Sequence, residues 1–403
     1  MAKPKIRFQG YTEDWEQRKF GDLFSRRMER NLGQFDNTRW ISVAKMYFQN
    51  PDKVTSNNID TRTYVMHEGD IAFEGHTNQE YRFGRFVAND IGDGVISELF
   101  PIYQHITSYD NNYWKYAIQI EAIMAPKLLR CIEISYTSSN KLDEKFFLEE
   151  YTMVPTIEEQ QKIGAYFTNL DHLITLHQRK CDETKKFKKF MLQKMFPKDG
   201  KKVPEIRFEG FTEEWEQRKL SDYLEVSKQK NRSQLFGKED VLSVSGKFGI
   251  VNQIEFQGRS FAGASVANYG VVEAGDVVYT KSPLKSNPYG IIKTNKGKTG
   301  IVSTLYAVYK PKNDTDSEFV QIYFESDFRM NTYMQPLVNK GAKNDMKVSD
   351  ENALKGSVAF PKIEEQRAIS RYFSHLDHLI TLHQRKCDKL QEIKKYMLQN
   401  MFI

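Results

Sequence analysis

Apolar side chains follow a helical rhythm in two long stretches of the chain. In residues 156 to 196, apolar or small residues recur at alternating spacings of three and four, the spacing of a coiled-coil seam. The seam residues are Phe167, Leu170, Ile174, Cys181, Thr184, Met191 and Met195. A proline precedes this stretch at Pro155, and Pro361 precedes a second stretch of the same kind. We therefore predict two helices of about 40 residues, each about 60 Å long at about 1.5 Å per residue.

Shorter apolar runs fill residues 36 to 154 and 236 to 360. Runs such as RWISVA, DVLSVS, GDIAF, GDVVY and GIVSTLYAVY are bounded by Gly, Asn and Pro, which is typical of strands. Helical stretches intervene, for example at Trp114 to Leu129 and at Ser317 to Thr332. Each of the two regions is therefore predicted to form a mixed α/β domain.

The chain contains an internal duplication. The opening segment PKIRFQGYTEDWEQRKF at residue 4 returns as PEIRFEGFTEEWEQRKL at residue 204, and the helical segment DHLITLHQRKCD occurs twice without change, 206 residues apart. Between these segments the two copies diverge, but Gly69-Asp70 and Gly275-Asp276 keep the same 206-residue offset. A repeat of this kind fixes the architecture before any local assignment does.

The duplication predicts an α+β fold with pseudo-twofold internal symmetry, in which two mixed α/β domains are joined by two long helices that pair as an antiparallel coiled coil. The four predicted segments are a first domain at 1–154 with the opening motif 4–20, a helix at 155–200, a second domain at 201–360 with the motif 204–220, and a helix at 361–403.

Several helix residues have more than one interpretation. His177 and His383 fall on the seam, where a buried polar residue fixes register, while a metal role is disfavoured because His172 and His177 are five residues apart rather than four. Cys181 and Cys387, which occupy equivalent positions of the two helices, are interpreted as small buried apolar residues. A lysine run from 185 to 202 is either a solvated face or a contact for a partner or phosphate.

Composition narrows the class of protein. The net charge of +6 and pI near 8.8 suit a polyanionic partner. No run of about 18 apolar residues is present that could span a bilayer. Three cysteines make no disulfide framework and the first residues lack an apolar signal segment, so we expect a cytoplasmic protein.

Polar and basic loops after the Gly-Asp strands carry side chains that suit DNA. The loops EGHTNQEYRFGR, from residue 74, and TKSPLKSNPYGIIK, from residue 280, supply hydrogen-bonding groups for base edges and cations for phosphates. An ordinary polar loop is the alternative for any single residue. The candidate DNA-binding residues are Lys45, His76, Thr77, Asn78, Arg82, Arg85, Lys247, Lys281, Ser282, Lys285, Ser286, Asn287, Tyr289, Lys343 and Asn344.

Catalytic signatures are missing from the sequence. Pro51-Asp52 is not followed by the Glu-x-Lys of a Mg-dependent nuclease, and no Walker loop occurs. FAGAS at 261–265 and Asn287-Pro288-Tyr289 are imperfect echoes of the cofactor loop and base-holding motif of a DNA methyltransferase. We therefore predict no catalytic residue, no metal site and no cofactor in this chain.

Taken together, these motifs resemble the specificity (S) subunit of bacterial type I restriction-modification systems over essentially the whole chain. The resemblance rests on the openings WEQRKFGDLF and WEQRKLSDYL, the two Gly-Asp turns, and the P-x-I-E-E-Q entry to each long helix. One departure concerns a Gly-x-Arg motif before the last strand, which Gly341-Ala342-Lys343 matches in part and Ser135-Tyr136-Thr137 does not.

The resemblance implies a function and partners. Two target recognition domains would each read one half of a split, asymmetric double-stranded DNA site, with the helices as an antiparallel spacer. The helices would bind two methyltransferase (M) subunits, and restriction/translocase (R) subunits would join them; those partners would use S-adenosylmethionine, ATP and Mg. The residues assigned to partner contact are Glu158, Glu159, Gln160, Phe167, Glu364, Glu365, Gln366 and Phe373.

Two other functions stay open from sequence alone. The methyltransferase echoes suggest a self-contained DNA-modifying enzyme, and the long helices are also compatible with a coiled-coil scaffold that does not contact DNA. Steep loss of DNA affinity with rising salt would separate a DNA reader from a scaffold.

Overall fold

The chain folds into two compact units. The computed structural model describes residues 3–54, 59–134, 139–198, 200–284, 287–340 and 346–403. Unit 1 consists of residues 1–179 and 384–403, and unit 2 of residues 180–383. Both units combine helices with strands, so the predicted α+β class is confirmed. These two units do not coincide with the four consecutive segments named from the sequence, because each unit contains the beginning of one long helix and the end of the other.

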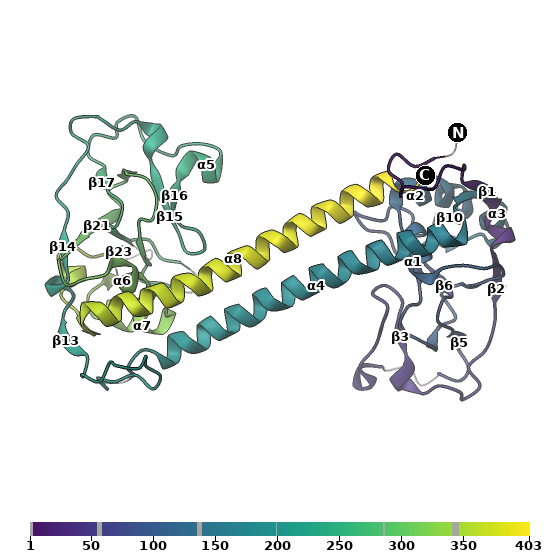
Figure 1. Ribbon diagram of the computed structural model, residues 1–403, viewed down its shortest axis with the longest axis horizontal. Coiled ribbons are helices and arrows are strands. Elements are labelled where there is room, and N and C mark those ends of the chain that lie inside the picture. Colours follow the sequence, from purple (N-terminus) through teal and green to yellow (C-terminus); the bar gives the residue numbers. More distant parts are fainter. Residues whose placement is uncertain (1–2, 55–58, 135–138, 199, 285–286, 341–345) are drawn as a thin grey trace. The chain divides into compact units, whose positions relative to one another are not determined.

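The two long helices are α4 (Ile157–Lys194) and α8 (Ile363–Asn400), drawn teal and yellow in Figure 1. Most of the predicted seam of α4 is buried, with Phe167 and Cys181 fully enclosed, while Ile174 and Thr184 are partly exposed. Each unit pairs the two helices antiparallel: Lys394 near the end of α8 bonds to Asp171 in unit 1, and Lys188 bonds to Asp377 in unit 2. The long helices and their pairing are therefore as predicted.

Unit 1 is built from small antiparallel sheets. The central sheet has the strand order β2-β9-β6-β7, and two-stranded pairs β1-β12, β5-β8, β3-β4 and β10-β11 surround it. The strands are β1 (Glu16–Lys19), β2 (Phe24–Arg27), β3 (Ile41–Ser42), β4 (Tyr47–Phe48), β5 (Thr63–Met66), β6 (Ile71–Glu74), β7 (Arg85–Ala88), β8 (Gly94–Ser97), β9 (Ile102–His105), β10 (Ile132–Glu133), β11 (Lys141–Leu142) and β12 (Tyr151–Val154). Its short helices are α1 (Asn111–Ala117), α2 (Glu121–Cys131) and α3 (Glu144–Glu149).

Unit 2 repeats this topology. Its central sheet has the order β14-β21-β18-β19, and the pairs β13-β24, β17-β20 and β15-β16 match those of unit 1. The strands are β13 (Glu216–Lys219), β14 (Leu224–Val226), β15 (Leu242–Ser245), β16 (Gly249–Asn252), β17 (Gly270–Val272), β18 (Val277–Thr280), β19 (Ile292–Thr294), β20 (Gly300–Val302), β21 (Tyr306–Pro311), β22 (Asn339–Lys340), β23 (Met346–Lys347) and β24 (Ser357–Phe360). The helices are α5 (Gln253–Gln257), α6 (Ser317–Tyr323) and α7 (Asp327–Met334).

The two predicted short helices are each broken into two. Residues 114 to 129 span α1 and α2, and residues 317 to 332 span α6 and α7. The second break has a local cause, because the Ser326 backbone is extended and its hydroxyl accepts a hydrogen bond from the Arg329 amide at 3.4 Å. Such a cap starts a new helix rather than continuing the previous one.

A repeated aromatic contact ties the end of a long helix to the opening motif of each unit. Phe402 lies 6.4 Å from the buried Trp15 ring in unit 1, and Phe196 lies 5.7 Å from Trp215 in unit 2, both edge to face. In unit 1 the Ile6 amide also donates to the Asn400 carbonyl at 2.9 Å, so both chain ends lie together (Figure 1). Among the described helices, none is both long and apolar enough to cross a membrane.

Candidate nucleic-acid interface

The Gly-Asp turn fixes the strand that leads into each candidate loop. Gly69 and Gly275 both have φ near +90°, a conformation that favours glycine. The buried Asp70 carboxylate accepts a 2.9 Å hydrogen bond from the His67 amide, and Asp276 accepts one of 2.8 Å from the Glu273 amide. Burial raises the pKa of both aspartates. Glycine and aspartate are thus needed for the turn itself.

The loop between β6 and β7 presents polar side chains on the surface of unit 1. His76, Thr77, Asn78 and Arg82 are exposed, and the DNA contacts predicted for them stay predictions. The Asn78 side chain accepts hydrogen bonds from the Glu80 and Tyr81 amides at 2.8 and 2.9 Å, which folds the loop into a turn. Arg82 donates to Glu121 at 3.3 Å. These hydrogen bonds fold the loop and link it to α2 through Glu121.

The prediction that Arg85 contacts DNA is corrected. Its side chain is 18% exposed and its Nε donates to Glu74 at 2.8 Å, so its charge is neutralised inside the unit. Its Nη2 also donates to the Ala44 carbonyl in the turn between β3 and β4. Arg85 thus links two parts of unit 1 through hydrogen bonds. It sets the β3-β4 turn, with the exposed Lys45, beside the loop after β6.

Unit 2 brings together the equivalent elements. Lys247 is exposed at the turn between β15 and β16. A Cβ built on Gly246 in that turn would lie 3.9 Å from the Ile291 side chain, so the turn adjoins the end of the loop after β18. Ser282 in that loop is exposed, while Lys281 is half-buried and paired with Asp350. Each unit therefore joins a lysine-bearing turn to a polar loop.

One further predicted contact in unit 2, that of Asn287, is corrected. Asn287 is buried and donates from its amide to Asp327 at 2.7 Å. Tyr289 is half-buried against the core, and its carbonyl accepts a 2.7 Å hydrogen bond from the Tyr279 hydroxyl. Asn287 thus shapes the loop from inside, while the contact predicted for Tyr289 stays a prediction. The candidates Lys285, Ser286, Lys343 and Asn344 lie outside the described residues.

The sequence did not predict a group of exposed phenylalanines in unit 2. Phe248, Phe256 and Phe261 lie on and after the β15-β16 hairpin, with 56%, 44% and 57% of their surfaces exposed. Their signal in the sequence is weak, because phenylalanine in a strand-rich region usually indicates core. Only the glycines, asparagine and glutamines around them point to a surface segment.

The charge environment of the Gly-Asp turn differs between units. In unit 1 the His67 ring lies between Glu29 and Asp93, at 2.9 and 2.8 Å. Burial alone would lower the pKa of His67, but these two carboxylates outweigh burial and the pKa is raised. In unit 2 the equivalent residue is Glu273, which pairs with Lys310 at 2.6 Å. The two copies thus keep the turn and change the charges around it.

The entry to each long helix is held by a repeated internal ion pair. Arg7 makes two hydrogen bonds of 2.7 and 2.8 Å to Glu159, and Arg207 makes two of 2.7 Å to Glu365. Both glutamates are buried. The prediction that Glu159 and Glu365 contact a partner is therefore corrected: their carboxylates anchor the opening segment to the helix.

Four more predicted partner contacts are internal. Gln160 accepts from the Asp110 amide at 3.2 Å and donates to the Pro155 carbonyl at 3.1 Å, and Gln366 repeats this pattern with Asp316 and Pro361. Phe167 and Phe373 have 0% exposure and lie in the cores of their units. Of the eight predicted residues, Glu158 and Glu364 remain exposed.

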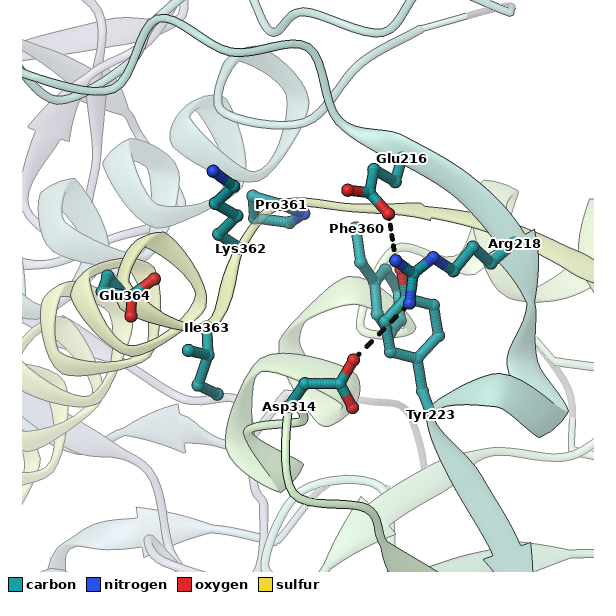
Figure 2. A pocket seen from close by; sticks show the side chains of 9 residues that line it. All are labelled: Glu216, Arg218, Tyr223, Asp314, Phe360, Pro361, Lys362, Ile363 and Glu364. Atoms are coloured by element: carbon teal, nitrogen blue, oxygen red, sulfur yellow. Dashed lines mark ion pairs between the residues drawn. The ribbon is translucent and has the colours of Figure 1, made fainter.

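The exposed glutamates line hollows at the helix entries. Glu158 lines one of about 490 Å³ in unit 1 together with Tyr11 and Lys162. Glu364 lines the equivalent hollow of about 240 Å³ in unit 2. Glu364 also borders a neighbouring pocket of about 220 Å³, where Figure 2 shows Arg218 between Glu216 and Asp314. This arginine is neutralised by the two carboxylates around it.

The described residues do not assemble a recognisable catalytic centre. No group of three His, Cys, Asp or Glu side chains that could hold a metal ion occurs among them. Residues 261 to 265 are irregular and lead from no strand into a helix, unlike a cofactor loop. The pKa of the buried Cys131 is raised to about 11, mainly by burial, which disfavours a reactive thiolate.

Comparison with known proteins finds sequence similarity to a curated protein. No protein-family model matches the chain. The chain is 23% identical over 261 residues to a protein of Methanocaldococcus jannaschii named as a type I restriction enzyme MjaX specificity subunit, a match that covers 61% of this chain and 56% of that protein. The chain therefore spans just over half the length of the curated relative it matches.

The fold is shared with a solved structure. The S subunit of a type I restriction-modification system from M. genitalium has a TM-score of 0.56 at 11% identity, covering 100% of this chain and 99% of that one. The HsdS subunit of Thermoanaerobacter tengcongensis has a TM-score of 0.49 at 15% identity, with 100% and 99% covered. In fold and in sequence, the chain is thus similar to the specificity subunits of type I restriction-modification systems, and the predicted resemblance is confirmed.

Proposed function

We propose that this chain is the DNA-reading, non-catalytic subunit of a type I restriction-modification complex, and that it recognises a bipartite, asymmetric DNA site. One observation carries the proposal: the two units share the same arrangement of strands and helices but expose different side chains. In each unit a lysine-bearing turn adjoins the loop after the Gly-Asp strand, and the side chains on the two loops differ. Two similar domains with different surfaces suit a site with two different halves.

The exposed residues match the two tasks of a DNA-reading surface. Hydrogen-bonding side chains such as Asn78 and Thr77 can read base edges in the major groove, while Lys45 and Lys247 can contact phosphates. Phosphate contacts supply affinity and base contacts supply specificity. The net charge of +6 adds a favourable long-range attraction to DNA.

The helix entries are the surfaces that we assign to partner subunits. Glu158 and Glu364 are exposed at equivalent positions, each beside a hollow built by the repeated opening segment. Two equivalent surfaces on one chain suit two copies of the same methyltransferase subunit. Restriction subunits would join that assembly, and S-adenosylmethionine, ATP and Mg would be bound by the partners rather than by this chain.

Mapping methylated adenines across the host genome tests the function. We expect one split motif with an unread gap, and we expect its methylation to disappear when the gene for this chain is deleted. The purified chain, incubated alone with S-adenosylmethionine and DNA, should transfer no methyl group. Methylation that survives the deletion, or methyl transfer by the chain alone, would contradict the proposal.

A further inference from the structure

Unit 2 exposes a patch of three phenylalanines on and after its β15-β16 hairpin. The patch consists of Phe248, Phe256 and Phe261, each more than 40% exposed. The first two rings are in contact, with centroids 5.4 Å apart. The equivalent hairpin of unit 1 exposes one aromatic ring, Tyr47 at 48%, and residues 49 to 54 after it contain no aromatic residue. The patch is therefore a property of one recognition surface and not of the shared frame.

The backbone that carries these rings is held in place by hydrogen bonds. Asn252 caps α5 by accepting from the Ile254 and Glu255 amides at 2.9 and 3.1 Å. Gly258 ends α5 with φ of 74°. The backbone of α5, a helix of only five residues that carries Phe256, is thus held at both ends.

Gln253 links the hairpin to the segment after α5. Its amide nitrogen donates to the Ser243 hydroxyl at 3.0 Å, and its oxygen accepts from the Phe261 amide at 2.6 Å. The Phe248 amide in turn donates to the Ser245 hydroxyl at 3.2 Å, so the backbone next to each ring is held by hydrogen bonds. Rings that are ordered and exposed before a partner arrives lose little conformational freedom on binding.

Positive charge accompanies the rings. The Lys247 ammonium lies 5.0 Å from the Phe248 centroid, and the Arg259 guanidinium lies 4.6 Å from that of Phe261. Glu255 on α5 is an acidic residue within the same segment. Apolar rings flanked by cations are complementary to DNA, where base faces lie between rows of phosphates. The patch also continues the proposed DNA surface, because Gly246 in the same turn adjoins Ile291.

We propose that Phe248 and Phe256 form a wedge that enters the base stack in the half-site read by unit 2, while Lys247 and Arg259 contact the flanking phosphates. This proposal rests on the DNA-reading function proposed above. It assigns unit 2 a second means of discrimination, because the cost of opening a base step depends on its sequence. Unit 1, whose hairpin exposes the single ring of Tyr47, would read its half-site without such a pair of rings.

Fluorescence of 2-aminopurine tests the wedge. The probe is placed in turn at each position of both half-sites, apart from the methylated adenines, and the full chain is assembled with its partner subunits at saturating concentration. We expect a several-fold rise in fluorescence at one step of the half-site assigned to unit 2. The double variant Phe248→Ala/Phe256→Ala should lose this rise, and the double leucine variant should keep most of it.

Phe328→Ala provides the matched control, because Phe328 is 70% exposed in the same unit but lies on α7. That variant should leave the signal unchanged. DNA that binds without any rise, or a rise that survives the double alanine variant, overturns the wedge while leaving DNA reading intact. Loss of partner assembly in the alanine variant, with the rise retained in the fraction that binds, would instead assign the patch to a protein contact. Absence of DNA binding by the unaltered complex would contradict the proposed function itself.

Discussion

Lys394 of α8 donates a 2.6 Å hydrogen bond to Asp171 of α4, and the repeat creates the same pairing with the helices exchanged. Lys188 of α4 bonds to Asp377 of α8 at 2.7 Å, and both positions are offset by 206 residues from their counterparts. Lys188 also bonds to Glu325 at 2.9 Å, which ties the helix to the α6-α7 connection of unit 2. The duplicated chain thus sets the register of its helix pair twice, once in each unit.

The Lys188→Met variant should destabilise unit 2. Lys188 is buried, and its removal leaves Glu325 and Asp377 without their shared cation. Loss of one partner from a buried ion pair is strongly destabilising, and partial exposure of the two carboxylates reduces the expected cost to about 2 kcal/mol. Denaturant unfolding measures the change. The exposed neighbour Lys189→Met is the control and should unfold like the unaltered chain.

The Arg7→Met variant should release the opening segment from α4. The Glu159 carboxylate would remain buried without its bidentate partner, at a cost of about 3 kcal/mol. Hydrogen exchange should accelerate in residues 3 to 14 and stay unchanged in the equivalent residues 203 to 214. Lys5→Met, at an exposed position of the same segment, should leave exchange slow. Equal exchange in both variants would mean that this ion pair does not hold the segment.

The stability of unit 1 should decline as pH rises through the pKa of His67. That pKa is raised in the folded state, where Glu29 and Asp93 outweigh the opposing effect of burial. Stabilisation is therefore fully present below the ordinary histidine pKa of about 6.5 and is lost above it, as the folded-state pKa is passed. A partly exposed pair contributes about 1 kcal/mol or less.

The measurement compares melting temperatures from pH 6 to pH 9. The His67→Gln variant should remove the decline in this range. Glu273→Gln, at the equivalent position of unit 2, should not alter it, because the Glu273-Lys310 pair stays charged on both sides throughout. A pH dependence that is the same in all three proteins would exclude His67 as its source.

The Lys45→Ala variant should weaken DNA binding without changing the recognised sequence. A lysine that contacts phosphate contributes about 0.9 to the slope of log affinity against log salt concentration. We expect the slope to fall by about that amount, as measured by fluorescence anisotropy with the assembled complex. Lys145→Ala, at an exposed position of α3 in the same unit, should keep the full slope. A relaxed sequence preference in Lys45→Ala would instead indicate a base contact.

The sequence predicted the features that depend on local pattern or on repetition. The bounds of α4 and α8, the strands and the Gly-Asp turns follow from periodicity and from the turn residues. The breaks between α1 and α2 and between α6 and α7 were missed, because an apolar face continues across both of them.

The candidate site was less predictable because it depends on long-range partners. Arg85 and Asn287 have the chemistry of DNA contacts, but Glu74 and Asp327 engage them inside the units. Glu159 likewise finds its partner in Arg7, 152 residues away in the sequence. Composition cannot distinguish a polar residue that faces solvent from one that satisfies another polar residue in the interior.

Exchange of one recognition region tests the central claim most directly. Residues 236 to 360 would be replaced by the corresponding residues of a relative with a different recognised site, and methylated adenines would be mapped across the genome. We predict that one half of the split motif changes, while the other half and the length of the unread gap stay the same. A change in both halves, or in neither, would contradict the assignment of one half-site to each unit.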